Sequence, residues 1–242
     1  MAKDSIYSQP LPEVTAFAFD DKVAAVFSDM IRRSVPGYST VIAMTGVLAE
    51  RYATPHSHIY DLGCSLGAAV LAMRHRIHAP DCKIIAVDNS EAMIQRCREN
   101  LAVEDSTVAV DILCADLRDL NIENASVVVM NFTLQFIPKD QRDAIIRKIY
   151  QGMKPGGAFI LSEKLHFDDA DADRLLIELH HEFKRANGYS DLEISQKRSA
   201  IENVLVPETL QTHLQRLKNA GFAQSELWFQ CFNFASVIAI KQ

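Results

Sequence analysis

The sequence predicts an α/β fold built on a mostly parallel seven-stranded sheet, with a C-terminal antiparallel hairpin and a helical extension at the N-terminus. From residue 56 onward, short β-branched apolar runs alternate with helical patterns, as in parallel sheets that are covered on both faces. The last two apolar runs are separated by too few residues for a helical crossover, so they should pair antiparallel. We expect a single domain over residues 1–242, in which residues 1–55 form the extension.

The individual elements follow from hydrophobic periodicity and from helix start and stop signals. Strands are expected at 57–62, 83–88, 107–113, 125–131, 157–163, 223–230 and 234–240. Helices are expected at 20–34, 39–53, 67–78, 90–100, 139–152, 172–186 and 207–220. The first two helices should be separated at Pro36, because proline bars helix continuation. Ser90 and Asp140 are the expected N-cap residues of their helices.

Composition and charge restrict the class of protein. The chain has 242 residues, of which 48% are hydrophobic, and 25 basic against 31 acidic residues give a net charge of −6. This balance disfavours direct binding of tRNA or another polyanion. No run of about 18 apolar residues occurs, so we expect a cytoplasmic protein without membrane contact. The five cysteines are scattered without a C-x-x-C pair, so neither a disulfide framework nor a metal site is expected.

A glycine-containing turn links the first predicted strand to the next helix. Residues 61–67 read DLGCSLG. Gly63 and Gly67 allow the backbone to approach a ligand closely, and they aim the N-terminus of the helix at it. The turn differs from a pyrophosphate-binding G-x-G-x-x-G loop, because Ser65 stands at the second glycine position. Taken alone, it also fits a simple strand-to-helix turn.

Polar residues end the strands that follow. Asp88 closes the apolar run 84–87, where an acidic side chain can accept both hydroxyls of a ribose. Asp116 follows the third predicted strand and Asn131 ends the fourth. Each residue taken singly could instead be a cap or turn residue. Because open α/β sheets bind ligands at the carboxyl ends of their strands, the series predicts a nucleotide-like cofactor at this edge.

A further helix should begin near residue 190, where SDLE is a capping-box sequence. Ile194 and Ile201 recur at helical spacing, and Lys197 and Arg198 occupy the turn between them. At least one cation should therefore lie on the inward face. A buried cation needs an anion. From the spacing alone, a structural salt bridge to a nearby carboxylate or snorkelling of the long side chain to water is the favoured interpretation.

Two sets of motifs resemble known families. The pattern D-x-G-x-x-x-G, then DNS at 88–90, ADL at 115–117 and NFTLQF at 131–136, resembles the class I methyltransferase superfamily. This implies a Rossmann-like fold and S-adenosyl-L-methionine (SAM). Longer stretches resemble the carboxy-S-adenosyl-L-methionine synthase family, which serves bacterial tRNA wobble-uridine modification. They are RSVPGYS at 33–39, FKRANGYS at 183–190, ISQKR at 194–198 and ELWFQCFNF at 226–234.

The resemblance implies a reaction and a set of site residues. Prephenate and SAM would give phenylpyruvate and carboxy-SAM, the carboxylated form of SAM. A separate tRNA carboxymethyltransferase would use carboxy-SAM to modify the wobble uridine to 5-oxyacetyluridine. A homodimer and no metal are expected. Arg198 would hold the new carboxylate, in its own subunit or in the neighbouring one. The residues implied to bind SAM are Tyr38, Gly63, Cys64, Ser65, Asp88, Asn89, Asp116, Leu117 and Asn131.

The mechanism expected from this resemblance needs no general base from the protein. Hydroxide leaving prephenate would deprotonate the SAM methyl group, and the resulting ylide would capture CO2. His180 and His181 lie in an apolar helical stripe, so they are expected to be packing residues. Cys64 has no basic neighbour in sequence to activate it as a nucleophile. Two alternatives remain, an ordinary small-molecule methyltransferase that would not need Arg198 and a non-catalytic SAM-binding module.

Overall fold

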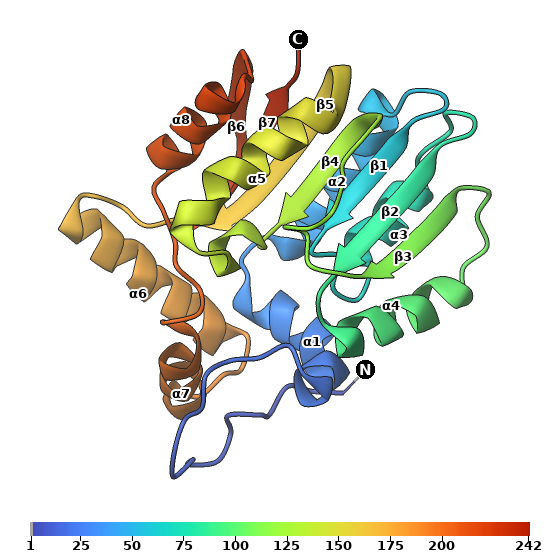
Figure 1. The fold of residues 1–242 in the computed structure, drawn as a ribbon. Coiled ribbons are helices and arrows are strands. Elements are labelled where there is room, and N and C mark those ends of the chain that lie inside the picture. Colours follow the sequence, from blue (N-terminus) through green and yellow to red (C-terminus); the bar gives the residue numbers. More distant parts are fainter. Residues whose placement is uncertain (1) are drawn as a thin grey trace.

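The computed structural model describes residues 2–242 and is organised around one seven-stranded sheet (Figure 1). The strand order is β3-β2-β1-β4-β5-β7-β6. Strands β1 to β5 are parallel, whereas β7 pairs antiparallel with β5 and β6. The predicted mostly parallel sheet with a C-terminal hairpin is confirmed. The strands are β1 (His58–Leu62), β2 (Lys83–Asp88), β3 (Ala109–Cys114), β4 (Ala125–Asn131), β5 (Met153–Lys164), β6 (Gln224–Cys231) and β7 (Phe234–Ile240).

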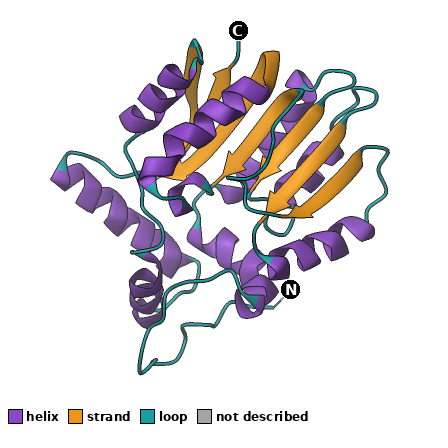
Figure 2. Cartoon of the chain, viewed as in Figure 1, coloured by secondary structure: helices purple, strands orange, loops and turns teal. Residues whose placement is uncertain are grey.

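Helices pack on both faces of this sheet (Figure 2). On one face α5 and α8 pack through Ile146, Ile149 and Leu217, and on the other α3 and α4 pack through Met73 and Ile94. These side chains are fully buried, which is the main stabilising contribution of each helix. The helices are α1 (Asp21–Ser34), α2 (Tyr38–Tyr52), α3 (Ala68–Arg74), α4 (Glu91–Ala102), α5 (Lys139–Gly152), α6 (Ala170–Ala186), α7 (Asp191–Ile201) and α8 (Leu210–Ala220), with the short 3-10 helix η1 (Leu134–Phe136).

Helix ends follow the predicted signals with one exception. The Ser90 hydroxyl accepts a hydrogen bond from the backbone N–H of Met93, and Ser190 forms the predicted capping box with Glu193. The prediction that Asp140 caps α5 is wrong. Pro138 occupies the cap position, because its carbonyl already accepts the N–H of Gln141, and Asp140 lies inside the first turn. Its carboxylate there still faces the positive end of the helix dipole.

Residues 2–20, α1 and the helices α6 and α7 gather beyond the carboxyl ends of the strands, whereas α2 packs on the sheet against α3, β4 and β5 (Figure 1). The helical part of the extension consists of α1 and α2, separated around Pro36 as predicted, and residues 2–20 form turns and extended chain. These residues are attached to α7. The N–H of Phe17 donates to the carbonyl of Ala200 at 2.9 Å, and the Gln196 amide donates to the carbonyl of Tyr7 at 2.9 Å.

A buried ion network joins α5 to α8. Arg142 is fully buried and donates to Glu208 at 2.6 Å, while Arg216 contacts the other oxygen of Glu208 at 3.0 Å. Arg142 also donates to the carbonyl of Gln135, at 3.1 Å. Since Gln135 belongs to η1, this network fixes the position of η1 at the carboxyl end of β4.

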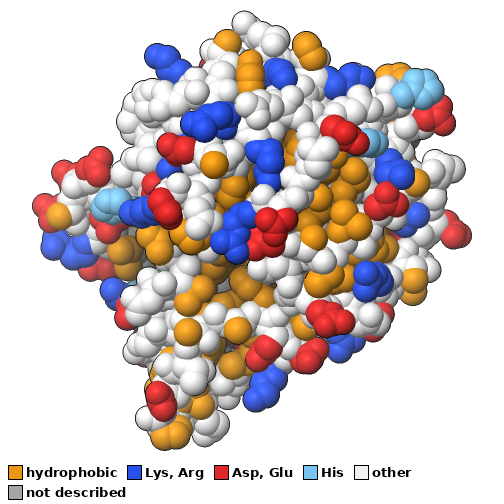
Figure 3. Space-filling view, viewed as in Figure 1, with side chains coloured by type: hydrophobic (Ala, Val, Ile, Leu, Met, Phe, Trp, Pro, Cys, Tyr) orange, Lys and Arg blue, Asp and Glu red, His pale blue; other side chains and the backbone are white. Residues whose placement is uncertain are grey.

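Figure 3 shows hydrophobic side chains on the part of the sheet, toward β3, that no helix covers on this side. Leu113 in β3 is among the exposed hydrophobic residues. None of the helices formed by residues 2–242 combines the length and the apolar character that a membrane crossing requires.

Candidate functional site

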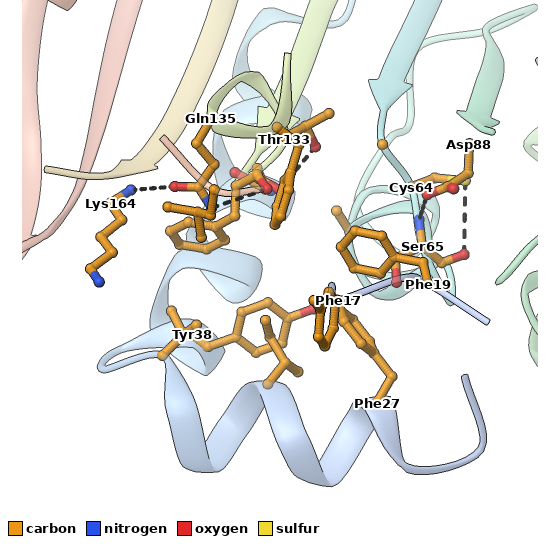
Figure 4. Close-up of a pocket in the computed structure, with 18 of the residues that line it drawn as sticks. Phe17, Phe19, Phe27, Tyr38, Cys64, Ser65, Asp88, Thr133, Gln135 and Lys164 are labelled. Carbon is orange, nitrogen blue, oxygen red and sulfur yellow. Dashed lines mark hydrogen bonds between the residues drawn. The ribbon is translucent and has the colours of Figure 1, made fainter. Parts of the chain in front are cut away.

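A cavity of about 470 Å³ lies between the carboxyl ends of β1, β2 and β4 and the helix α1. Ligand pockets commonly have volumes of about 300 to 1,000 Å³, and open α/β sheets bind ligands at this edge. Phe17, Phe19 and Phe27 of the extension line the side opposite the strand ends (Figure 4). The extension therefore covers the cavity with aromatic side chains.

The predicted glycine turn forms the floor at the end of β1. Gly63 has φ of +89°, and a Cβ added there would come within 2.1 Å of the hydroxyl of Thr133. Both facts require glycine at this position. The turn is attached to β2, because the N–H of Ser65 donates to a carboxylate oxygen of Asp88 at 2.9 Å.

Asp88 joins two elements at the cavity. Its second oxygen accepts the N–H of Ser90 at 2.9 Å, so one carboxylate fixes both the glycine turn and the start of α4. Burial raises the pKa of Asp88, although backbone N–H groups of Ser90, Ser65 and Asn89 oppose this shift. Each carboxylate oxygen has two lone pairs, so the ones left free can accept hydroxyl groups from a ligand.

Two polar groups in the cavity wall have no partner. These are Oδ2 of Asp61 and Nδ2 of Asn131, both buried without a hydrogen bond within residues 2–242. Burial, and then the charge of Asp88, raise the pKa of Asp61 to about 7. An unpaired acceptor and an unpaired donor in one cavity match a ligand with an ammonium and a carboxylate group, such as the methionine part of SAM.

Asp61 is a functional candidate that the sequence reasoning missed. Asp61 is the first residue of the glycine turn, and the sequence analysis predicts no role for its side chain. The available signal was a carboxylate within the predicted strand, directly before the glycine turn, since an acidic residue buried there needs a partner. Asn131, by contrast, was predicted and lies where expected.

Nine of the ten predicted site residues line this cavity together. Asp116 among them already binds the guanidinium of Arg118 through both oxygens, at 2.9 Å from Nε, and this lowers its pKa. Burial and the nearby Asp61 raise the pKa of Tyr38, so it remains a neutral phenol. The nine residues are Tyr38, Gly63, Cys64, Ser65, Asp88, Asn89, Asp116, Leu117 and Asn131.

Arg198 is the predicted residue that the structure does not bring to the cavity. Its side chain is 62% exposed, its Nε lies 3.9 Å from Glu202, and it lines a separate depression beside His181. The inward cation expected on α7 is Lys197, which is 9% exposed and donates to the hydroxyl of Ser34 at 3.2 Å. The prediction of an inward cation is confirmed. The role of Arg198 stays a prediction.

Lys164 and Lys184 also line the cavity, and sequence reasoning did not assign them to it. Burial lowers the pKa of both lysines. His180 shares this part of the wall and packs edge-on against Phe234, with ring centroids 4.8 Å apart. Burial lowers its pKa to about 2, so it is neutral, as expected for a packing residue.

The thiol of Cys64 is buried beside the glycine turn. Hydrogen bonding to Cys97 and burial raise its pKa. A nucleophilic cysteine requires the opposite shift. Within residues 2–242, His, Cys, Asp and Glu side chains form no group of three arranged to hold a metal ion.

The fold and the cavity define a SAM-binding protein of the class I methyltransferase type. Residues 59–157 match a family described as a methyltransferase domain. Among solved structures with this fold are a putative SAM-dependent methyltransferase from Methanococcus maripaludis and human N-acetylserotonin methyltransferase in complex with SAM. The first has a TM-score of 0.61 at 19% identity, covering 96% of this chain and 98% of that chain. The second has a TM-score of 0.62 at 16% identity, covering 91% of this chain and 55% of that chain.

Full-length relatives identify the family within this class. The chain is 63% identical over 239 residues to a protein of Trichlorobacter lovleyi named carboxy-S-adenosyl-L-methionine synthase, covering 98% of each chain. It is 59% identical over 240 residues to the protein of that name from Shewanella oneidensis, covering 99% of each. The chain belongs to the carboxy-S-adenosyl-L-methionine synthase family.

Proposed function

We propose that this chain converts SAM and prephenate into carboxy-SAM and phenylpyruvate. The observation that carries the proposal is its identity of 63% over nearly the full length of a relative named for the synthesis of carboxy-SAM. The cavity supports it, because an acidic end suited to SAM adjoins an end with lysines suited to an anionic co-substrate.

SAM would bind as a substrate at the carboxyl ends of β1, β2 and β4. The carboxylate of Asp88 would accept the ribose hydroxyls, as in other nucleotide sites at this edge. Asp61 would pair with the ammonium group and the Asn131 amide would donate to the carboxylate, which would give both orphaned atoms a partner. The aromatic residues Phe17 and Phe19 would exclude water on the side of the cavity opposite the strand ends.

The proposed reaction balances without an oxidant or a protein base. Prephenate, a dianion, loses CO2 and hydroxide to give the phenylpyruvate monoanion. The hydroxide takes a proton from the SAM methyl group to form water. The methyl carbon then forms a bond to CO2, which gives carboxy-SAM with a new carboxylate. The role of the chain would be to hold the two substrates together and to stabilise the anions.

We further propose a homodimer in which Arg198 stabilises the new carboxylate in the neighbouring subunit. Arg198 is on the outside of its own cavity, and a long exposed guanidinium suits a carboxylate presented across an interface. The product would pass to a separate tRNA carboxymethyltransferase in the cytoplasm, which would complete 5-oxyacetyluridine at the wobble position. The excess of acidic residues supports a chain that does not itself bind tRNA.

The test is mass spectrometry of the products after incubation of the protein with SAM and prephenate. The proposal requires a gain of about 44 Da on SAM, the mass of CO2. The Arg198→Ala variant should lose this product. Formation of S-adenosylhomocysteine would instead indicate an ordinary methyltransferase, and binding of SAM without turnover would indicate a non-catalytic module.

Mixing two inactive variants tests the subunit in which Arg198 acts. In a dimer of Arg198→Ala with Asp88→Ala, one site regains both residues if Arg198 crosses the interface. Random exchange of subunits would then restore about a quarter of wild-type activity. If the mixture recovers no activity, Arg198 acts in its own subunit.

A further inference from the structure

Three lysines from three different elements line one end of the cavity. Lys164 ends β5, Lys184 is in the last turn of α6, and Lys197 is in α7. In Figure 4 the Lys164 side chain extends away from the rings, at the end opposite Asp88. These three residues form a lysine cluster.

Ser34 and His180 connect the members of the lysine cluster. The Ser34 hydroxyl accepts from Lys197, and its carbonyl accepts from Nε2 of His180 at 2.8 Å. His180 is one helical turn before Lys184 on α6, so it faces the same side. Lys164 also influences His180, since its charge helps to lower the histidine pKa. The cluster therefore surrounds one part of the cavity.

The charges of the lysine cluster are not paired within residues 2–242. No ion pair joins any of the three ammonium groups to a carboxylate, in contrast to the surface residue Lys83, which pairs with Asp111 at 3.0 Å. The acidic residues whose charges reach the cluster bind other groups and form no ion pair with any of its three lysines. Asp4 accepts from the Tyr189 hydroxyl at 2.5 Å, and Asp173 accepts from the N–H of Phe167 at 3.0 Å.

Burial and mutual repulsion act on these groups together. Burial, followed by the charges of Lys197, Lys164 and Arg198, lowers the pKa of Lys184 to about 7. Burial also lowers the pKa of Lys197 to about 8, against the charge of Asp4. Partly buried like charges are unfavourable unless an anion joins them. A ligand anion would supply the negative charge that these three lysines lack as an ion-pair partner.

We propose that Lys164, Lys184 and Lys197 form the subsite for a carboxylate of the second substrate, namely the carboxylate that remains in the keto-acid product. This rests on the proposed function, in which that substrate is a dicarboxylate and loses its other carboxylate as CO2. The lysine cluster would orient the substrate so that the departing carboxylate faces SAM.

The carboxylate that remains in the product is the one expected to bind the lysine cluster. Ion pairing stabilises a carboxylate in the ground state and so opposes its loss as CO2. The carboxylate that departs is better placed in apolar surroundings. Phe132 and Phe234 form apolar surroundings next to the cluster, and their ring centroids are 6.0 Å apart. Phe234 also packs on His180. The cavity thus offers a cationic position and an aromatic position side by side.

The experiment compares Lys164→Gln and Lys184→Gln with Lys83→Gln as the control, because Lys83 is in β2 and does not line the cavity. The proposal requires the KM for prephenate to rise by roughly 10- to 100-fold in each cluster variant, the loss of one charged hydrogen bond. The Kd for SAM, measured by calorimetry, should change less than twofold. Lys83→Gln should match the wild type in both.

Thermal stability separates a binding role from a structural one. Removal of one of several repelling charges should leave the Tm of the ligand-free protein unchanged or raise it. A Tm that falls together with weaker SAM binding in both cluster variants would overturn the proposal. An unchanged KM for prephenate in both variants would overturn it as well.

Phenylpyruvate binding keeps this proposal distinct from the proposed function. It carries the retained carboxylate and its binding needs no turnover. If the wild type makes no carboxy-SAM, the proposed function fails, but phenylpyruvate binding that is lost in Lys184→Gln still supports the subsite. Failure of the wild type to bind phenylpyruvate, or equal binding by the variants, would refute the subsite.

Discussion

Replacing Asp61 with asparagine should stabilise the ligand-free protein at alkaline pH and weaken SAM binding. Burial, and then the charge of Asp88, raise the Asp61 pKa from its ordinary value of 3.8 to about 7. Because the folded-state pKa is above the unfolded one, Asp61 causes no loss of stability below about pH 4. The free energy of unfolding that is lost through Asp61 increases as the pH rises to about 7, and above that pH the loss is constant.

The size of the effect follows from the same shift. A shift from 3.8 to about 7 corresponds to about 4 kcal/mol at pH 8. About 2 kcal/mol of this develops between pH 5.5 and pH 8. These are upper limits, since the new amide must also find hydrogen-bond partners. The stability gain of Asp61→Asn over the wild type should therefore grow by up to about 2 kcal/mol, or roughly 4–8 °C in Tm, across this pH range.

The assay is thermal unfolding of both proteins at each pH, with calorimetry of SAM binding at pH 8. Loss of the charged contact to the ammonium group should raise the Kd for SAM by roughly 10- to 100-fold. Asp111→Asn is the matched control, because Asp111 is an exposed aspartate on β3. A Tm difference between Asp61→Asn and the wild type that does not vary with pH would refute the reasoning.

Three further outcomes can be measured on purified protein. Gly63→Ala should lower the free energy of unfolding by at least about 1 kcal/mol, from the left-handed backbone alone, and abolish SAM binding, since its methyl group would displace Thr133; unchanged calorimetric binding would contradict this. Glu208→Gln should cost about 3–5 kcal/mol in denaturant unfolding, because Arg142 is fully buried and would lose its carboxylate; a loss below 1 kcal/mol would show that solvent compensates the charge. Arg198→Ala should leave the Tm unchanged while removing carboxy-SAM formation, because the side chain is exposed; a marked fall in Tm would indicate a structural role instead.

Local sequence signals predicted most of the fold because they act over a few residues. Alternation of apolar residues placed the strands, and the short connection at Phe232 predicted the antiparallel hairpin. Ser190 and Glu193 predicted the start of α7 through their own hydrogen bonds. The sequence did not predict the N-cap of α5 correctly, because both Asp140 and Pro138 precede or begin the helical pattern. The N-cap is the residue whose carbonyl accepts the first helical hydrogen bond, and that residue is Pro138.

The cofactor end of the site was predictable for a different reason. In a parallel sheet the carboxyl ends of all strands meet at one edge, so Gly63, Asp88 and Asn131 could be brought together without knowledge of packing. The lysine cluster could not. Lys164 is on a strand, while Lys184 and Lys197 are on helices that leave the sheet, and their meeting depends on how α6 and α7 fold back.

The two ends of the cavity differ in charge in a way that fits the chemistry of the two proposed substrates. Asp61 and Asp88 are at the end suited to the ammonium, ribose and sulfonium groups of SAM, and the lysine cluster lies at the other. A cationic cluster directly at the sulfonium would oppose SAM binding, since like charges repel strongly in a cavity of low dielectric. Aromatic side chains lie between the two ends, so the carboxylates can bind the cationic groups of SAM while the lysines bind an anion. In the proposed reaction, the aromatic side chains between the two ends would hold CO2, which is neutral, until it reacts.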